Sequence, residues 1–149
     1  MSAPGDVATI ARVVVVEDNA LMRAATTARL DREPDIDVVG EASGHAEAMS
    51  SIEQLAPDIV VLDLRLGDSA QVGVDLAAEI GRRFPEVRVL VYSAFLSSRH
   101  SELLRFPNVW GYVLKTWSPR SVVEAVRVVA RGERYQAPGS AGTGTDLPR

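Results

Sequence analysis

The stretch Pro-Asp-Ile-Val-Val-Leu-Asp at residues 57–63 decides the fold. Its centre, Ile59 to Leu62, is apolar at every position, which is typical of a short strand buried on both faces of a sheet. Four other short runs are equally rich in Val, Leu or Ile, and they are Arg12 to Val16, Ile36 to Glu41, Val87 to Tyr92 and Val109 to Leu114. Strands buried on both faces are typical of parallel sheets covered by helices.

Segments with a helical repeat of apolar residues separate these runs. The first stripe consists of Leu21, Ala24, Ala25 and Ala28, and this spacing predicts one buried helix face. Further stripes lie within 48–56, 76–84 and 122–130, and a weaker one spans Leu96 to Arg105. Strands alternating with helices predict an α/β fold: a doubly wound, five-stranded parallel sheet with five helices and right-handed crossovers.

The composition of the 149 residues indicates one compact domain, because 46% are hydrophobic and 24% are charged. The absence of Cys excludes disulfides and thiolate metal sites. The longest apolar stretches have about four residues, whereas about 20 are needed to cross a bilayer, and no export signal precedes them. We therefore expect a cytoplasmic protein without membrane contact. A net charge of −4 provides no overall attraction for nucleic acid.

Both ends of the chain lack the apolar repeat. Pro, Gly, Ser and Thr dominate residues 136–149, and residues 1–10 precede the first apolar run. We expect a disordered N-terminal flank over 1–10, a folded domain over 11–135, and a linker or tail over 136–149.

Polar side chains follow four of the five apolar runs. Glu17 and Asp18 follow the first, Asp63 the third, Ser93 the fourth and Lys115 the fifth. Functional crevices of parallel sheets lie at the carboxyl ends of the strands, and neighbouring strands are about 4.8 Å apart, so these groups should fall within about 15 Å. Only one of the 16 Lys and Arg residues is a lysine, which indicates that a compact point charge is needed there.

Three carboxylates at one edge of a sheet would raise one another's pKa values unless a cation neutralised them. Oxygen ligands and retained waters favour Mg²⁺, which proteins commonly hold together with phosphate oxygens. Asp63 is the candidate nucleophile, because a carboxylate can accept a phosphoryl group. Lys115 and Mg²⁺ would stabilise charge on the transferred group, and Ser93 would hydrogen-bond one of its oxygens. Taken alone, Glu17 and Asp18 could instead cap the following helix.

These residues stand in four motifs, which are Val-Val-Val-Glu-Asp (14–18), Pro-Asp-Ile-Val-Val-Leu-Asp (57–63), Leu-Val-Tyr-Ser-Ala (90–94) and Gly-Tyr-Val-Leu-Lys (111–115). With them the chain resembles the CheY-like receiver domain of two-component response regulators over residues 11–135. The resemblance implies a flavodoxin-like strand order of 2-1-3-4-5. It also implies a signalling domain that catalyses only its own phosphorylation and dephosphorylation.

The resemblance further implies a role for each matching residue. Asp63 would be the phosphoacceptor, assisted by Lys115 and Ser93, and Ser93 and Tyr112 would form the conformational switch. The Mg²⁺ ligands would be Asp18, Asp63 and the main-chain carbonyl of Arg65, with Glu17 acting through water. The implied partner is a sensor histidine kinase.

Residues 132–138 resemble the junction that follows the receiver in the NarL/FixJ class, whose output is a DNA-binding helix-turn-helix domain. This implies control of transcription through a domain that is missing from this chain, which would not itself bind nucleic acid. Homodimerisation on phosphorylation is a further expectation, with a candidate apolar face near Trp110 and Val113. The loop over 64–73 departs from the family, since it lacks the usual Met-Pro and is longer.

Four alternatives remain open. The chain could be a natural single-domain receiver, or a receiver fold that serves as a phosphate-independent interaction module. A haloacid-dehalogenase-type phosphatase would also use an aspartate and Mg²⁺, but it needs a second Asp where Arg65 stands. A flavodoxin-like FMN binder needs a Gly- or Ser/Thr-rich phosphate loop, which the turn over 17–20 does not offer.

Overall fold

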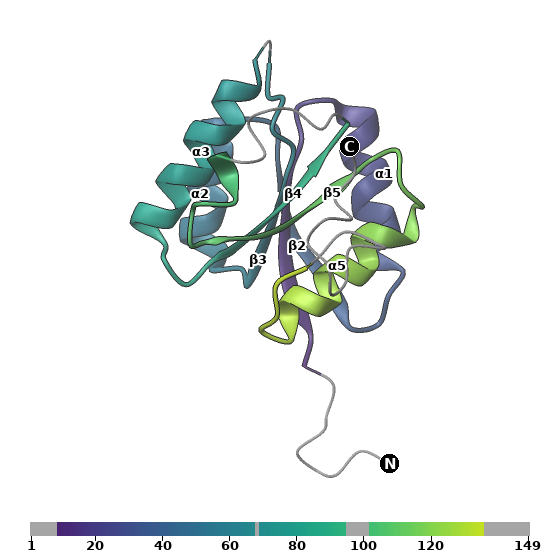
Figure 1. The fold of residues 1–149 in the computed structure, drawn as a ribbon. Helices are drawn as coiled ribbons and strands as arrows, with labels where there is room; N and C mark the ends of the chain where they lie inside the picture. Colours follow the sequence, from purple (N-terminus) through teal and green to yellow (C-terminus); the bar gives the residue numbers. More distant parts are fainter. Residues whose placement is uncertain (1–8, 68, 95–101, 136–149) are drawn as a thin grey trace, which may run out of the picture.

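The computed structural model describes residues 9–67, 69–94 and 102–135. Its sheet has five parallel strands in the order β2-β1-β3-β4-β5 (Figure 1). The strands are β1 Ala11–Val16, β2 Ile36–Ala42, β3 Ile59–Leu62, β4 Arg88–Ser93 and β5 Val109–Leu114. The predicted sheet and strand order are confirmed, and every strand begins and ends within one residue of the predicted position.

Four helices are assigned among the described residues, and they are α1 Ala20–Asp31, α2 His45–Leu55, α3 Ala70–Arg83 and α5 Arg120–Ala130. The fifth predicted helix, over Leu96 to Arg105, falls largely on residues outside the described ranges. Figure 1 shows α2 and α3 on one face of the sheet and α1 and α5 on the other. None of the helices in the described part of the chain is long and apolar enough to cross a bilayer.

The core consists of two layers of side chains, one on each face of the sheet. Under α2 and α3, residues such as Val60 and Val89 pack against Ile52 and Ile80. Under α1 and α5, alternate strand residues such as Val61 and Leu90 pack against Leu30 and Val126. Strands β1 and β3 are therefore buried on both faces, as their continuous apolar sequence predicts.

The predicted inward face of α1 is wrong. Leu21 is 79% exposed, Ala24, Ala25 and Ala28 are also exposed, and the buried residues are Thr26 and Leu30. Alanine methyl groups gain little from burial, so this stripe is a weak determinant of helix orientation. The single large side chain of Leu30, which is fully buried, determines which face meets the sheet.

Candidate functional site

Three carboxylates meet at the carboxyl edge of the sheet. Glu17 and Asp18 directly follow β1, and Asp63 directly follows the adjacent β3, where its N–H donates to the Val16 carbonyl at 3.0 Å. One carboxylate oxygen from each residue lies within 4.8 Å of those of the other two. Glu17 and Asp63 are buried and Asp18 is exposed, so the cluster is open to solvent on the Asp18 side.

Lys115 joins this cluster from the end of β5. Its Nζ donates to Glu17 Oε1 at 2.5 Å and to Asp63 Oδ2 at 3.4 Å. Its main-chain N–H also donates to the Ser93 carbonyl at 2.7 Å, which aligns the ends of β4 and β5. The structure therefore brings together the side chains of Glu17, Asp18, Asp63 and Lys115. Ser93 ends the neighbouring β4, and its main-chain carbonyl is the group that contacts Lys115.

The pKa of Asp63 is raised to about 6, mainly by burial; the Lys115 charge opposes this rise and the nearby Glu17 adds to it. Burial alone would lower the pKa of Lys115, but the bonds to Glu17 and Asp63 outweigh it and raise the pKa overall. Lys115 therefore stays charged, while Asp63 is partly protonated near pH 6. A cation near Asp63 would favour its charged form.

The helix-capping alternative for Glu17 and Asp18 does not describe α1. The cap is Asn19, whose side chain accepts from the Met22 N–H at 2.9 Å. Arg23 also supports this turn, since its Nη1 donates to the Glu17 carbonyl at 2.7 Å and its Nε lies 3.3 Å from Glu41. Sequence reasoning missed Arg23, because nothing in the sequence separates it from the other arginines.

The unusual loop after Asp63 turns back over the cluster. The Arg65 N–H donates to Asp63 Oδ1 at 3.2 Å, and the Gly67 N–H donates to Asp18 Oδ2 at 2.7 Å. Gly67 has a φ of 73°, a left-handed conformation that favours glycine. Further along, a Cβ at Gly73 would lie 2.2 Å from the Leu64 carbonyl oxygen, so only glycine allows α3 to pack so close to the loop.

Ser93 and Tyr112 lie on neighbouring strands and on the same face of the sheet. Val91 pairs with Tyr112, and Ser93 is two residues further along β4, so the two side chains point to the same side. Ser93 is buried, and Tyr112 is half-buried with its ring centre 6.0 Å from that of Trp117. This placement is compatible with a switch pair, whose movement stays a prediction.

The apolar face predicted around Trp110 and Val113 is not present. Val113 is 1% exposed and belongs to the core. Trp110 is half-buried between two guanidinium groups, with Arg88 4.4 Å and Arg134 4.6 Å from its ring centre. Alternation along β5 turns Val113 toward α5, so an apolar residue there indicates burial.

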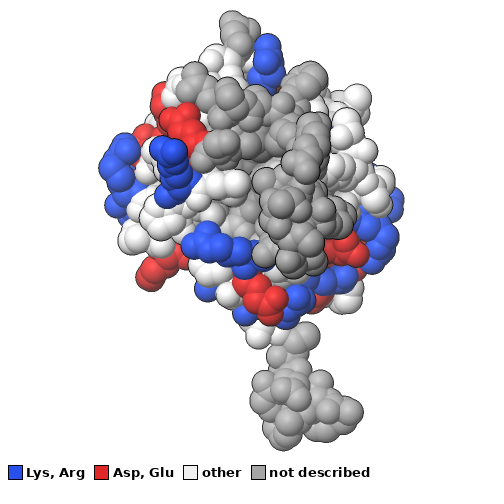
Figure 2. Space-filling view, viewed as in Figure 1, with Lys and Arg blue, Asp and Glu red and all other residues white. Residues whose placement is uncertain are grey.

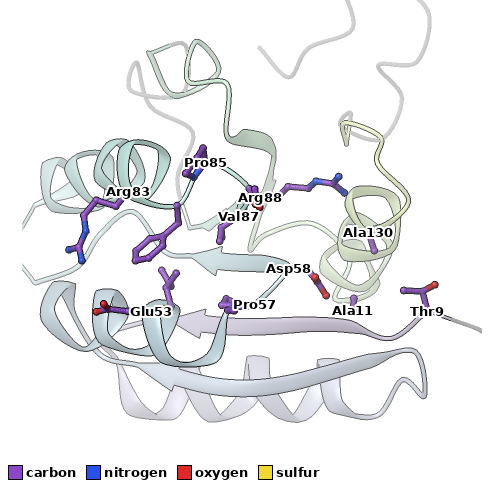
Figure 3. A pocket seen from close by; sticks show the side chains of 14 residues that line it. Thr9, Ala11, Glu53, Pro57, Asp58, Arg83, Pro85, Val87, Arg88 and Ala130 are labelled. Carbon is purple, nitrogen blue, oxygen red and sulfur yellow. The ribbon is translucent and has the colours of Figure 1, made fainter.

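A hollow of about 560 Å³ lies at the opposite edge of the sheet. Figure 3 shows its lining, which includes Ala11 at the start of β1, Pro57 and Asp58 before β3, Val87 before β4 and Ala130 at the end of α5. All of these residues except Ala130 lie at the amino ends of the strands. The hollow is therefore separate from the carboxylate cluster.

The donor set of the cluster fits a hard divalent cation. It offers carboxylate oxygens from three residues, and an exposed carboxylate, Asp18, provides access. Such oxygen-only sets suit Mg²⁺ better than transition metals. Among the described residues, these three are the group of His, Asp and Glu side chains whose geometry could hold an ion.

Comparison with known proteins agrees with this geometry. The model of the family "Response regulator receiver domain" matches residues 13–127. The response regulator protein VraR of Staphylococcus aureus (strain NCTC 8325 / PS 47) is 31% identical over 127 residues, which cover 85% of this chain and 60% of VraR. The chain thus spans about 60% of the length of the curated relatives it matches.

Solved structures give the same result. A LuxR-family two-component response regulator from Aurantimonas sp. SI85-9A1 superposes with a TM-score of 0.79 at 28% identity, covering 87% of this chain and 91% of that one. The response regulator domain of Thermotoga maritima CheB superposes with a TM-score of 0.70 at 26% identity, covering 87% and 99%. The chain therefore belongs to the family of response regulator receiver domains of two-component systems.

Proposed function

We propose that this domain is a phosphorylation switch in which Asp63 accepts a phosphoryl group from a phosphohistidine of a sensor histidine kinase. One observation carries the proposal: the carboxylates of Glu17, Asp18 and Asp63 converge within 4.8 Å, and Lys115 bridges two of them. The Asp63 carboxylate oxygen would form the new bond to phosphorus while the bond to the histidine nitrogen breaks. The product is an acyl phosphate on Asp63 and a free imidazole.

The other residues of the cluster have supporting roles. Asp18, Asp63 and the Arg65 carbonyl would hold Mg²⁺ directly, and Glu17 would hold it through water. The ion supplies positive charge at the transferred oxygens when it is bound. Lys115 would then leave Glu17 and pair with a phosphoryl oxygen, because its Nζ already lies 3.4 Å from Asp63 Oδ2.

Ser93 and Tyr112 would transmit the change. The Ser93 hydroxyl would donate to a phosphoryl oxygen, and its shift toward Asp63 would open space that the half-buried Tyr112 ring can enter. Both side chains lie on the face that packs under α3, so this movement would alter the surface around β5. A population shift between two conformations is sufficient to signal.

The output would be transcription, controlled through a DNA-binding domain outside this chain, in the cytoplasm. The folded unit would span 11–135, and phosphorylation would promote homodimerisation. Figure 2 shows acidic and basic side chains interspersed on the visible face rather than gathered in one basic patch. For the described residues of this face, this distribution, together with the net charge of −4, supports the proposal that the receiver itself does not bind nucleic acid.

A phosphate-independent interaction module is the second candidate. It is favoured by the Gly67 N–H, which donates to Asp18 Oδ2 at 2.7 Å, a bond that a metal ion binding this oxygen would have to share or displace. A natural single-domain receiver shares the chemistry of the first proposal and differs only in its output.

The deciding experiment is intact mass measurement after incubation with acetyl phosphate and Mg²⁺. We expect one added phosphoryl group, which should be absent in Asp63→Asn and in the presence of a chelator. If no adduct forms and beryllofluoride with Mg²⁺ also leaves the spectra of the protein unchanged, the phosphoacceptor role is wrong and the interaction module is the better explanation.

A further inference from the structure

We propose that Tyr92 is a positioning residue for Lys115, and that its aromatic ring supports the lysine side chain on its path to Asp63. The inference rests on the proposed function of Asp63. It assigns to β4 a part in the site that sequence reasoning gave only to Ser93.

The strand order creates the need for such a support. Lys115 follows β5 and Asp63 follows β3, and β4 lies between these strands. Two strand spacings amount to about 9.6 Å, so the lysine side chain must cross β4 to reach its partners. The residue that lies under this crossing determines how the lysine is held.

The sheet register places Tyr92 under that crossing. Leu62 pairs with Val91. The residues that follow them, Asp63 and Tyr92, therefore lie side by side. Tyr92 pairs in turn with Val113, and Lys115 is two residues further along on the same face.

The contacts agree with the register. Lys115 Nζ lies 5.5 Å from the centre of the Tyr92 ring, within the range of a cation–π interaction. Tyr92 also borders the same small hollow as Glu17 and Asp63. Burial raises the pKa of Tyr92, so its ring stays neutral and presents an unmodified π face to the ammonium group.

The ring is the partner of Lys115 that the proposed reaction leaves in place. Glu17 and Asp63 hold the ammonium group in this structure, and both would be engaged by the cation or the phosphoryl group in the loaded site. A four-carbon side chain released from both carboxylates would become mobile, and ordering it again opposes the reaction. The flat ring of Tyr92 beneath the lysine side chain limits this mobility and adds no charge to the site.

Two variants of Tyr92 separate the support from other effects. Tyr92→Leu removes the π face while keeping an apolar side chain, and Tyr92→Phe keeps the ring and removes only the hydroxyl. Tyr135→Leu is a matched control, because Tyr135 is half-buried against the same core layer but lies beside Gly111 at the outer edge of β5. Thermal unfolding of each variant ensures that all measurements use folded protein.

The contact is tested without any phosphorylation. Lys115 is the only lysine in the sequence, so protein labelled with ¹³C-lysine gives one set of side-chain signals in NMR. We expect the ring current of Tyr92 to shift the ε-methylene protons upfield. The shift should vanish in Tyr92→Leu and persist in Tyr92→Phe and Tyr135→Leu.

The role is tested by the rate at which acetyl phosphate modifies Asp63 at saturating Mg²⁺. We expect Tyr92→Leu to be about three- to thirtyfold slower than the wild type, the range of a cation–π interaction, with the rate restored in Tyr92→Phe. If the wild type is modified and Tyr92→Leu reacts equally fast, or if Tyr92→Phe is as slow as Tyr92→Leu, the inference is wrong. A wild type without any adduct would overturn the proposed function instead, while the NMR shift would still report on the contact.

Discussion

At Asp63, the cost of burying a charge opposes the proposed reaction, which needs the carboxylate in its charged form. Asp63 is 8% exposed, and burial raises its pKa from 3.8 to about 6, so its charge is held at neutral pH against the preference of its surroundings. Lys115 offsets only part of this effect. A carboxylate that is poorly solvated yet accessible on the Asp18 side is well suited to bind a cation and react.

The first prediction follows from the direction of this pKa change. Asp63→Asn removes the buried charge, and we expect it to raise the free energy of unfolding at pH 7 in the presence of a chelator. Because the pKa is raised from 3.8 to about 6, the charge penalty builds up between about pH 4 and pH 6 and is complete above about pH 6. One pKa unit corresponds to about 1.4 kcal/mol, so the gain should approach about 3 kcal/mol at pH 7 and fall to about 0.5 kcal/mol at pH 4.

Urea unfolding of wild type and variant at the two pH values measures this difference. Asp37→Asn is the matched control, because Asp37 is an exposed aspartate on β2, and it should change stability by less than about 0.5 kcal/mol. An Asp63→Asn variant that is less stable than the wild type at pH 7 would show that the bond to Lys115 outweighs the cost of burial.

Residues of the site were predictable where the sheet itself brings them together. Glu17, Asp63 and Lys115 each follow an apolar run, and parallel strands end at one edge, so composition and spacing were sufficient. Arg23 and Gly67 act through a side chain on α1 and a main-chain N–H in a loop, and neither contact has a sequence signature. Tyr92 ends the fourth apolar run, but its place beside Asp63 depends on the register between β3 and β4, which the structure supplies.

At the scale of elements, α1 shows why a periodic apolar stripe can mislead. Leu21 and Leu30 belong to one helix, yet Leu21 is 79% exposed and Leu30 is fully buried. Periodicity detects which residues share a face, but it does not say which face gains most by meeting the sheet. The stripes predicted within 48–56, 76–84 and 122–130 mark the buried faces of α2, α3 and α5, apart from the exposed Ala56 and Ala130 at their ends. These stripes contain several large side chains such as Ile52, Ile80 and Val126.

The second prediction compares the two leucines of α1. Leu30→Ala should lower the free energy of unfolding by about 2–5 kcal/mol, because it opens a cavity in the layer under α1 and α5. Leu21→Ala makes the same chemical change at an exposed position and should alter stability by less than about 0.5 kcal/mol. Chemical denaturation gives both values, and similar losses in the two variants would contradict the orientation of α1.

At the scale of the whole molecule, Arg134 and Tyr135 lie along the outer edge of β5 and cover part of this edge strand. Beyond α5, Tyr135 N–H donates to the Trp110 carbonyl at 2.8 Å, and Arg134 Nη1 donates to the Val109 carbonyl at 2.7 Å. A Cβ at Gly111 would lie 2.8 Å from Tyr135 Cβ, so glycine allows this close approach. An unpaired edge strand invites association with other chains, and these residues occupy part of that edge. Apolar periodicity did not predict this cover, since residues 133–135 carry no strand or helix pattern.

The last prediction uses this cover to test where the folded unit ends. A chain shortened to end after Gly132 loses Arg134 and Tyr135, which uncovers Trp110 and the outer edge of β5. We expect it to unfold with a free energy lower by about 2 kcal/mol, the order of magnitude for a partly buried aromatic side chain and its hydrogen bonds, and to self-associate at high concentration. A chain shortened to end after Gln136 keeps every contact named above and should match the full chain, because the predicted domain extends only to residue 135.

Urea unfolding and sedimentation velocity compare the three chains. Equal stability of the two shortened chains would mean that the cover contributes nothing. A loss of stability in both would place the end of the domain beyond residue 136.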